Sequence, residues 1–260
     1  MKLLHFISLF LLLSFSFSLF ADPKEFQGKR FDFSDSGSLK KLWQLKGKRF
    51  GIPLTRFTIT PCNAAEDKSV LTIKANRSTG FLATPIPENI WRKYPILRWR
   101  WRIVKKISFS GKELDDQAAV VYFGDGTVVK NFLVGYRWED SFALGSQSLI
   151  KYAMGATTVH RICMRNSKAE PLRWSVEERN VIKDFQKAFG RMPQGKCALS
   201  IGANSQYSKS DTLVEIDYIE FRPVPAKKKA PDPDISKIAE REKKKCRRFR
   251  RYPCGSGKVP

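Results

Sequence analysis

The chain has 260 residues, of which 42% are hydrophobic, and its formal net charge is +23 at pH 7. This length is enough for one domain with a sizeable buried core. The excess of 48 Lys and Arg over 25 Asp and Glu favours an anionic partner. Because the N-terminal segment described next predicts export, we expect this partner to be an envelope polymer, a lipid headgroup or an acidic glycan, and not nucleic acid.

A targeting segment opens the chain. Lys2 supplies a short positive region, residues 3–20 are mostly apolar, and the small residue Ala21 precedes a polar stretch. This pattern is typical of a secretory signal peptide over residues 1–21. The alternative is an uncleaved membrane anchor, but no second apolar run of spanning length follows. We therefore expect an exported protein, periplasmic or secreted, whose mature chain begins at Asp22.

The cysteines and histidines give little support for a zinc site. No C-x-x-C motif occurs, and His160 is the only histidine of the mature chain. An odd number of cysteines leaves at least one unpaired, even where export permits disulfides. We expect no cofactor, and metal binding is left open. The five cysteines are Cys62, Cys163, Cys197, Cys246 and Cys254; the last two are close enough in sequence to close a small loop.

Residues 42–224 are predicted to form one all-β domain after a lead-in over residues 22–41. Short segments with two-residue alternation recur between turn signals, which is typical of a β-sandwich or jelly roll. The predicted strands cover residues 55–60, 69–76, 80–86, 97–103, 118–123, 131–138, 157–164, 197–201 and 213–221. Pro223 and Pro225 close the domain. Residues 225–260 form a basic tail that we expect to attach to an anionic polymer, or to have no partner.

The strand at residues 97–103 alternates large apolar side chains with arginines. Trp99 and Trp101 share the apolar face and can each bury roughly 150–250 Å², so we expect them in the core. The opposite face carries a row of three arginines, Arg98, Arg100 and Arg102. Like charges in a row repel unless acids or an anionic ligand lie among them. The acids expected within salt-bridge reach of Arg100 are Asp115, Asp116, Glu178 or Asp184, with Asp115 and Asp116 opening a strand that could pair antiparallel with this one.

One helix is predicted near the end of the domain. Ser175 and Glu178 form a capping box, in which each side chain satisfies a backbone donor of the first turn. Phe185 and Phe189 then repeat at four-residue spacing, and Gly190 supplies the C-terminal stop. The helix is expected to lie across a sheet edge or the end of the sandwich.

Catalytic motifs are weak in this sequence. It has no P-loop, no dinucleotide-binding glycine fingerprint and no Gly-x-Ser-x-Gly elbow. His160 lies mid-strand, where a structural role is favoured over that of a triad base. Asp115 or Asp116 could hydrolyse a glycosidic bond together with an acid from the helix region. That acid would be Glu177, Glu178 or Asp184. Capping by Glu178 and a salt bridge from Asp115 or Asp116 to the arginine row explain the acids without catalysis.

Aromatic side chains beside polar ones can stack on sugar rings. Tyr136 and Trp138 share a strand face, and Trp138 is followed by Glu139 and Asp140 at the strand end. We expect Tyr136 or Trp138 at the rim of the polar face that the arginines form.

Four motifs, in this order along the chain, resemble the domain-of-unknown-function 3047 family. They are Pro95-x-Leu97-x-Trp99-Arg100-Trp101-Arg102, Asp115-Asp116 before an Ala-Val-Val-Tyr-Phe strand, Tyr136-x-Trp138, and Trp174-x3-Glu178-Arg179-Asn180-Val181-x2-Asp184-Phe185-x3-Phe189-Gly190. The likeness covers roughly residues 42–222. It implies an exported β-sandwich related to galactose-binding and carbohydrate-binding jelly rolls, and implies no settled activity. The chain departs from the family in having Leu114 for a glycine and no acid between residues 202 and 210.

The prediction is therefore an all-β sandwich of the jelly-roll, galactose-binding-like type, with one short helix and a basic tail. We interpret it as a non-catalytic binding module for an envelope glycan or other anionic polymer. The alternatives are a carbohydrate-active hydrolase with paired carboxylates and a structural envelope protein. The candidate ligand-binding residues are Arg98, Arg100, Arg102, Asp115, Asp116, Tyr136, Trp138, Glu178 and Asp184.

Overall fold

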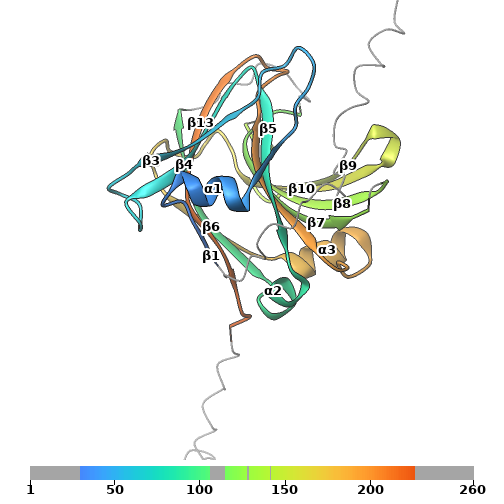
Figure 1. The fold of residues 1–260 in the computed structure, drawn as a ribbon. Helices are drawn as coiled ribbons and strands as arrows, with labels where there is room; N and C mark the ends of the chain where they lie inside the picture. The colour runs from blue at the N-terminus through green and yellow to red at the C-terminus, as the bar shows by residue number, and fades with distance from the viewer. Residues whose placement is uncertain (1–29, 106–114, 128, 141, 226–260) are drawn as a thin grey trace, which may run out of the picture. The chain divides into compact units, whose positions relative to one another are not determined.

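The computed structural model describes residues 30–105, 115–127, 129–140 and 142–225. These residues form two β-sheets that face each other, with short helices at the edges (Figure 1). The predicted β-sandwich is confirmed. The predicted signal peptide and nearly all of the basic tail lie outside the described residues. No helix in the described ranges is long and apolar enough to cross a membrane.

The first sheet has six strands and is antiparallel throughout. Its order is β11-β6-β13-β4-β3, and β1 also pairs with β13. The strand with alternating tryptophan and arginine is β6, and it lies between β11 and the closing strand β13. The six strands are β1 (Arg30–Asp32), β3 (Arg56–Pro61), β4 (Ser69–Asn76), β6 (Ile96–Lys105), β11 (Ser175–Asn180) and β13 (Asp211–Arg222).

The second sheet has seven strands in the order β2-β5-β12-β7-β8-β10-β9. Its pairs are antiparallel except β8 with β10, which run parallel. The strand after Asp115 and Asp116 is β7, so its expected pairing with β6 is wrong, because the two strands belong to different sheets. The seven strands are β2 (Gln44–Lys46), β5 (Thr79–Ile86), β7 (Gln117–Gly126), β8 (Asn131–Trp138), β9 (Gln147–Tyr152), β10 (Thr157–Arg165) and β12 (Cys197–Asn204).

Aromatic side chains fill the space between the sheets. Trp99 and Trp101 on β6 are fully buried, which confirms that the tryptophans face the core and the arginines face outward. The ring of Trp99 lies 5.2 Å from Tyr136, and that of Trp101 lies 5.3 Å from Trp138, between ring centroids. Tyr136 and Trp138 are therefore core residues, and their predicted place at the rim of a binding surface is wrong.

The helix prediction is right in part. Helix α3 (Val181–Phe189) ends at Gly190, whose φ of 68° is left-handed, as the glycine stop predicts. The capping box is wrong: Ser175 and Glu178 lie in β11, where backbone pairing with β6 replaces it, and Asn180 caps α3 by accepting from Lys183 N. Two further helices, α1 (Ser36–Leu42) and α2 (Glu88–Lys93), and the 3₁₀ turn η3 (Ala153–Gly155) were not predicted.

Candidate functional site

The three arginines of β6 are paired with acids of the neighbouring strand β13. Arg100 contacts Asp217 at 2.5 Å, Arg102 contacts Glu215 at 2.6 Å, and Arg98 lies 3.8 Å from Glu220, each between a guanidinium nitrogen and a carboxylate oxygen. The register of the two strands puts these side chains on one face. The acids predicted to lie beside Arg100 are not its partners, because β13 lies directly beside β6.

This arginine face is a closed charge network. The Trp174 ring lies 4.6 Å from the Arg100 guanidinium and 4.5 Å from that of Arg102, measured from the ring centroid. The side chain of Asp217 is fully buried, and this burial raises its pKa, while Arg100 acts in the opposite direction. Three cations thus meet three carboxylates, with the indole over two of the cations, and the arrangement explains these residues as structural.

The acids expected beside Arg100 are dispersed over the molecule. Asp184 accepts from the Arg179 guanidinium at 2.7 and 2.8 Å and from the Tyr136 hydroxyl at 2.9 Å. Glu178 is exposed on β11. Asp116 is buried and accepts backbone N–H groups of residues 207 and 208, so it fixes the turn before β13; burial raises its pKa.

Asp115 belongs to a second set of charges, on the outer face of the seven-stranded sheet. We call this set the Asp115 cluster, and its members are Asp115, Arg137, Glu139, Tyr152 and Arg161. Arg137 is at its centre: its guanidinium lies 3.0 Å from Asp115 and 2.8 Å from Glu139, and it donates to Gln117 at 2.6 Å. Tyr152 donates to Asp115 at 2.7 Å, and Arg161 lies 3.8 Å from it. Two arginines thus balance two carboxylates.

Burial within the cluster is uneven. Arg137 and Glu139 are buried, and burial raises the pKa of Glu139, opposed by the charge of Arg137. Burial and the charge of Asp115 also raise the pKa of Tyr152, which keeps its phenol protonated as a donor. The Asp115 side chain, by contrast, is 32% exposed. Arg161 is half-buried and lies over the half-buried Phe142 ring, 5.2 Å from its centroid. The accessible carboxylate of the cluster is therefore Asp115, and Arg161, whose side chain is 12% exposed, lies beside it.

An apolar strip continues from the cluster along the same face of the sheet. It consists of Phe81, Ala83, Val120, Tyr122, Leu133 and Val159, with Tyr152 packed against it. A Cβ atom added to Gly202 would come within 2.1 Å of the Phe81 ring, and one added to Gly135 within 2.5 Å of the Tyr122 ring. Both rings therefore lie against the sheet where the backbone has no side chain. Phe81 and Tyr122 are each 8% exposed.

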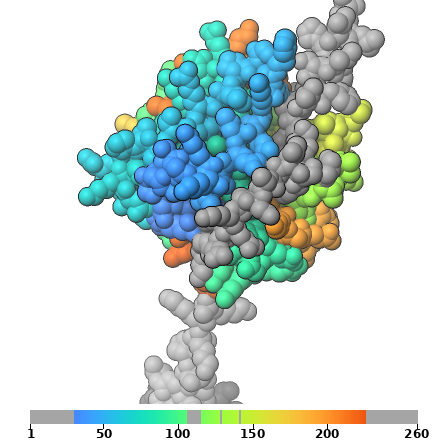
Figure 2. Space-filling model, viewed as in Figure 1, coloured from blue at the N-terminus to red at the C-terminus, as the bar shows by residue number. Residues whose placement is uncertain are grey.

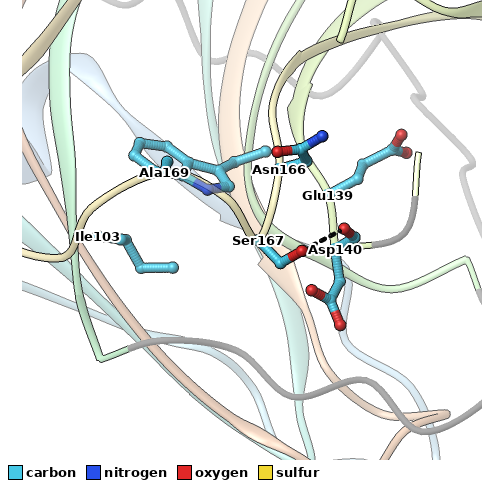
Figure 3. A pocket seen from close by; sticks show the side chains of 7 residues that line it. Ile103, Glu139, Asp140, Asn166, Ser167 and Ala169 are labelled. Carbon is cyan, nitrogen blue, oxygen red and sulfur yellow. Dashed lines mark hydrogen bonds between the residues drawn. The ribbon is translucent and has the colours of Figure 1, made fainter. Parts of the chain in front are cut away.

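A shallow pocket lies behind Glu139 and is a weaker candidate. Figure 3 shows its lining, where the Ser167 hydroxyl donates to the Asp140 carbonyl at 2.9 Å. Its cavity volume is about 10 Å³, far below the roughly 300–1,000 Å³ of small-molecule sites. Within the described parts of the chain, no group of three or more His, Cys, Asp and Glu residues could hold a metal ion.

Asp115 was among the predicted site residues, but its partners were not. Arg137, Glu139, Tyr152 and Arg161 come from three further segments of the chain, and no local pattern joins them. One signal was present: glycines inside predicted strands mark places where another group approaches the backbone closely. Gly135 in the strand at 131–138 is such a glycine. The ring that lies over it, that of Tyr122, is on the same face of the sheet as the Asp115 cluster.

A family model described as "Protein of unknown function (DUF3047)" matches residues 43–220. The chain belongs to the DUF3047 family. The match spans the sandwich from just before β2 into β13, so the arginine face and the Asp115 cluster both lie within the DUF3047 domain. Among curated proteins, none matches this chain.

Some solved structures resemble the DUF3047 domain distantly. A family 11 carbohydrate-binding module from Clostridium thermocellum, in complex with a β-1,3-1,4-mixed-linked tetrasaccharide, has a TM-score of 0.38 and 11% identity, covering 75% of this chain and 95% of that chain. The mannan-recognising module TmCBM27 has a TM-score of 0.32 and 11% identity, with the same two coverages. A carbohydrate esterase of the Shiga toxin-encoding bacteriophage phi24B has a TM-score of 0.32 and 11% identity, covering 74% and 95%. At TM-scores and identities this low, neither a ligand nor an activity of these structures can be assigned to this protein.

Proposed function

We propose that the DUF3047 domain of this chain is a non-catalytic glycan-binding module, and that the sugar binds at the Asp115 end of the outer face of the seven-stranded sheet. The observation that carries the proposal is a part-exposed carboxylate, Asp115, held between a phenol and a guanidinium at the end of a strip that contains aromatic rings. Carboxylates and arginines bind the paired hydroxyls of sugars, and aromatic rings accept their apolar faces.

The local geometry supports this placement. Asp115 offers oxygens that are already oriented by Tyr152 and Arg137, so little conformational freedom is lost when a ligand binds. Arg161 is similarly fixed, because its Nε donates to the Ser148 hydroxyl at 3.0 Å and its guanidinium lies over Phe142. The half-buried rings of Tyr152 and Phe142 flank this end of the face. The two rings that belong to the strip itself, Phe81 and Tyr122, are buried against the sheet.

The same geometry argues against hydrolysis. Asp115 and Glu139 share one guanidinium, that of Arg137, which remains charged at all physiological pH values and favours the ionised carboxylates over the protonated acid that hydrolysis requires. The pairing of Asp115 with an acid from the helix region is wrong. Asp184 bonds Tyr136, whose side chain points into the core, whereas Asp115 bonds Arg137, the next residue along β8, which points to the opposite face.

A glycan array with the purified chain, followed by calorimetry on the best sugar, tests the proposal. We expect Asp115→Asn and Arg161→Gln to weaken binding by about tenfold or more, since each removes a charged hydrogen-bonding group. Glu170→Gln is the matched control, because Glu170 is exposed and pairs with an exposed Arg173. Thermal unfolding of each variant shows whether the fold is retained.

Three results would count against the proposal. If no glycan binds, the structural alternative is favoured. If Asp115→Asn and Arg161→Gln retain full affinity in folded protein, the site is elsewhere. If the chain releases reducing sugar from a bound polymer and Asp115→Asn abolishes that release, the domain is a hydrolase.

A further inference from the structure

Three loops meet at one end of the sandwich, and we call them together the loop end: residues 47–55 between β2 and β3, residues 77–78 between β4 and β5, and residues 205–210 between β12 and β13. Backbone bonds join the second and third loops, from Ser205 N to the Ser78 carbonyl at 2.9 Å and from Arg77 N to the Ser210 carbonyl at 3.1 Å. Figure 1 shows the first and third of these loops, blue and orange, near each other at the top of the molecule.

The charge of the loop end is uniformly positive. Its 17 residues include Lys48, Arg49, Arg77 and Lys209 and no Asp or Glu. The Arg49 guanidinium donates to two neutral groups, the Gln206 side chain at 3.0 Å and the Tyr207 hydroxyl at 3.4 Å. Lys48, Arg77 and Lys209 are exposed. The loop end thus presents four cations that no acid of its own three loops neutralises.

Two aromatic side chains protrude between these cations. Phe50 is fully exposed, and Tyr207 is 41% exposed. Phe50 is followed by Gly51 at a left-handed φ of 72°, where an added Cβ would meet nothing within 4 Å. Tyr207 is held from below, because its backbone N–H and that of Ser208 are bound by the buried carboxylate of Asp116. Figure 2 shows blue and orange segments together along the upper edge of the molecule.

We propose that the loop end docks on an anionic lipid surface, with Phe50 inserted among the headgroups and the surrounding Lys and Arg bound to lipid phosphates. Exposed aromatic side chains flanked by basic residues are the pattern that favours the membrane–water interface. Each Lys or Arg near an anionic membrane adds attraction that salt screens.

The same residues fit a lipid surface better than a sugar or a nucleic acid base. A base or sugar ring stacks on an aromatic side chain that its surroundings hold in place, whereas Phe50 protrudes fully exposed at the tip of its loop. A lipid interface requires only an apolar side chain free to enter it. The loop end uses none of the residues of the Asp115 cluster, so this proposal and the glycan proposal can fail independently.

Vesicle sedimentation with the full chain tests the proposal. We expect binding to vesicles of phosphatidylcholine with one quarter phosphatidylglycerol, and much weaker binding to pure phosphatidylcholine. Phe50→Ser should weaken binding about tenfold or more, and Lys48→Ala or Lys209→Ala about fivefold each at low salt. The matched control is Met154→Ser, because Met154 is 85% exposed at the opposite end of the seven-stranded sheet and should not contribute.

A local probe separates the loop end from the basic tail, which is present in every variant. In Phe50→Trp, the added tryptophan emission should shift to the blue on vesicles and be quenched by brominated lipid, after subtraction of the unsubstituted chain. The proposal is overturned if the chain does not bind anionic vesicles, if Phe50→Ser binds as well as the unsubstituted chain, or if Phe50→Trp shows no shift. Equal competition by heparin or an oligonucleotide, with no effect of Phe50→Ser, would instead indicate a general polyanion site.

Discussion

Aromatic rings lie over two glycines of the second sheet, and the distances predict how much an added side chain would lower the free energy of unfolding. In Gly135→Ala, the new Cβ would lie 2.5 Å and 2.8 Å from two carbons of the Tyr122 ring, while the third-nearest atom, on Val159, is 3.5 Å away. Contacts below about 3 Å require a shift, so the ring must lift from the sheet. Overpacking of this kind costs about 1–3 kcal/mol of unfolding free energy, a substantial part of the 5–15 kcal/mol typical of a domain.

Gly124→Ala should be more destabilising than Gly135→Ala. There the new Cβ would lie 2.0 Å from the backbone carbonyl oxygen of Phe132 and 2.8 Å from the Leu133 Cα, and a backbone cannot yield as a ring can. We expect this variant to lose more than about 3 kcal/mol. Urea unfolding, followed by tryptophan fluorescence and by circular dichroism, measures both losses.

A double-mutant cycle tests the reason. If the Tyr122 ring causes the cost of Gly135→Ala, that cost should largely disappear in a Tyr122→Leu background, giving a coupling free energy of about 1 kcal/mol or more. A cost of Gly135→Ala below about 0.5 kcal/mol, or an equal cost in both backgrounds, would refute the placement of the ring over the backbone.

Two further predictions concern buried charges. Arg100→Ala should cost about 3 kcal/mol or more of unfolding free energy, because it leaves the buried Asp217 carboxylate without its arginine partner. Arg98→Ala should cost under about 1 kcal/mol, since Arg98 and Glu220 are 3.8 Å apart and partly exposed. Similar losses of the two variants in urea unfolding would contradict this contrast. Burial raises the pKa of Asp116 above its ordinary value of 3.8, so the folded chain binds more protons between the two pKa values and the free energy of unfolding falls as pH rises through that window. In Asp116→Asn this part of the pH slope should be missing, which urea unfolding from pH 4 upward would show.

Local alternation was enough to predict most of the strands. Residues 69–76 and 131–138 coincide with β4 and β8, because both have a clear two-residue period between turn residues. The short strands β2 and β9 were missed, since three to six residues at a sheet edge need no strong pattern. Residues 175–180 fit a capping box locally, yet they form β11, because pairing with β6 outweighs a local motif.

The charge partners could not be predicted in the same way. Arg100 and Asp217 are 117 residues apart in the chain, and only the register of β6 against β13 brings them together. Asp115 was identified, but its partner Arg137 depends on β7 and β8 lying side by side in the second sheet. A single sequence shows which residues share one strand face; it does not show which strand lies next to it.

The position of β13 has a consequence for synthesis of the protein. This strand, the last in the described part of the chain, lies between β6 and β4 and also pairs with β1, so the six-stranded sheet can close only after residue 222 has left the ribosome. Until then β6 has an unpaired edge, and the face of the sheet that carries Trp99 and Trp101 is incomplete, a state prone to aggregation. A nonsense mutation before residue 211 should therefore give an insoluble fragment rather than a shortened but folded domain.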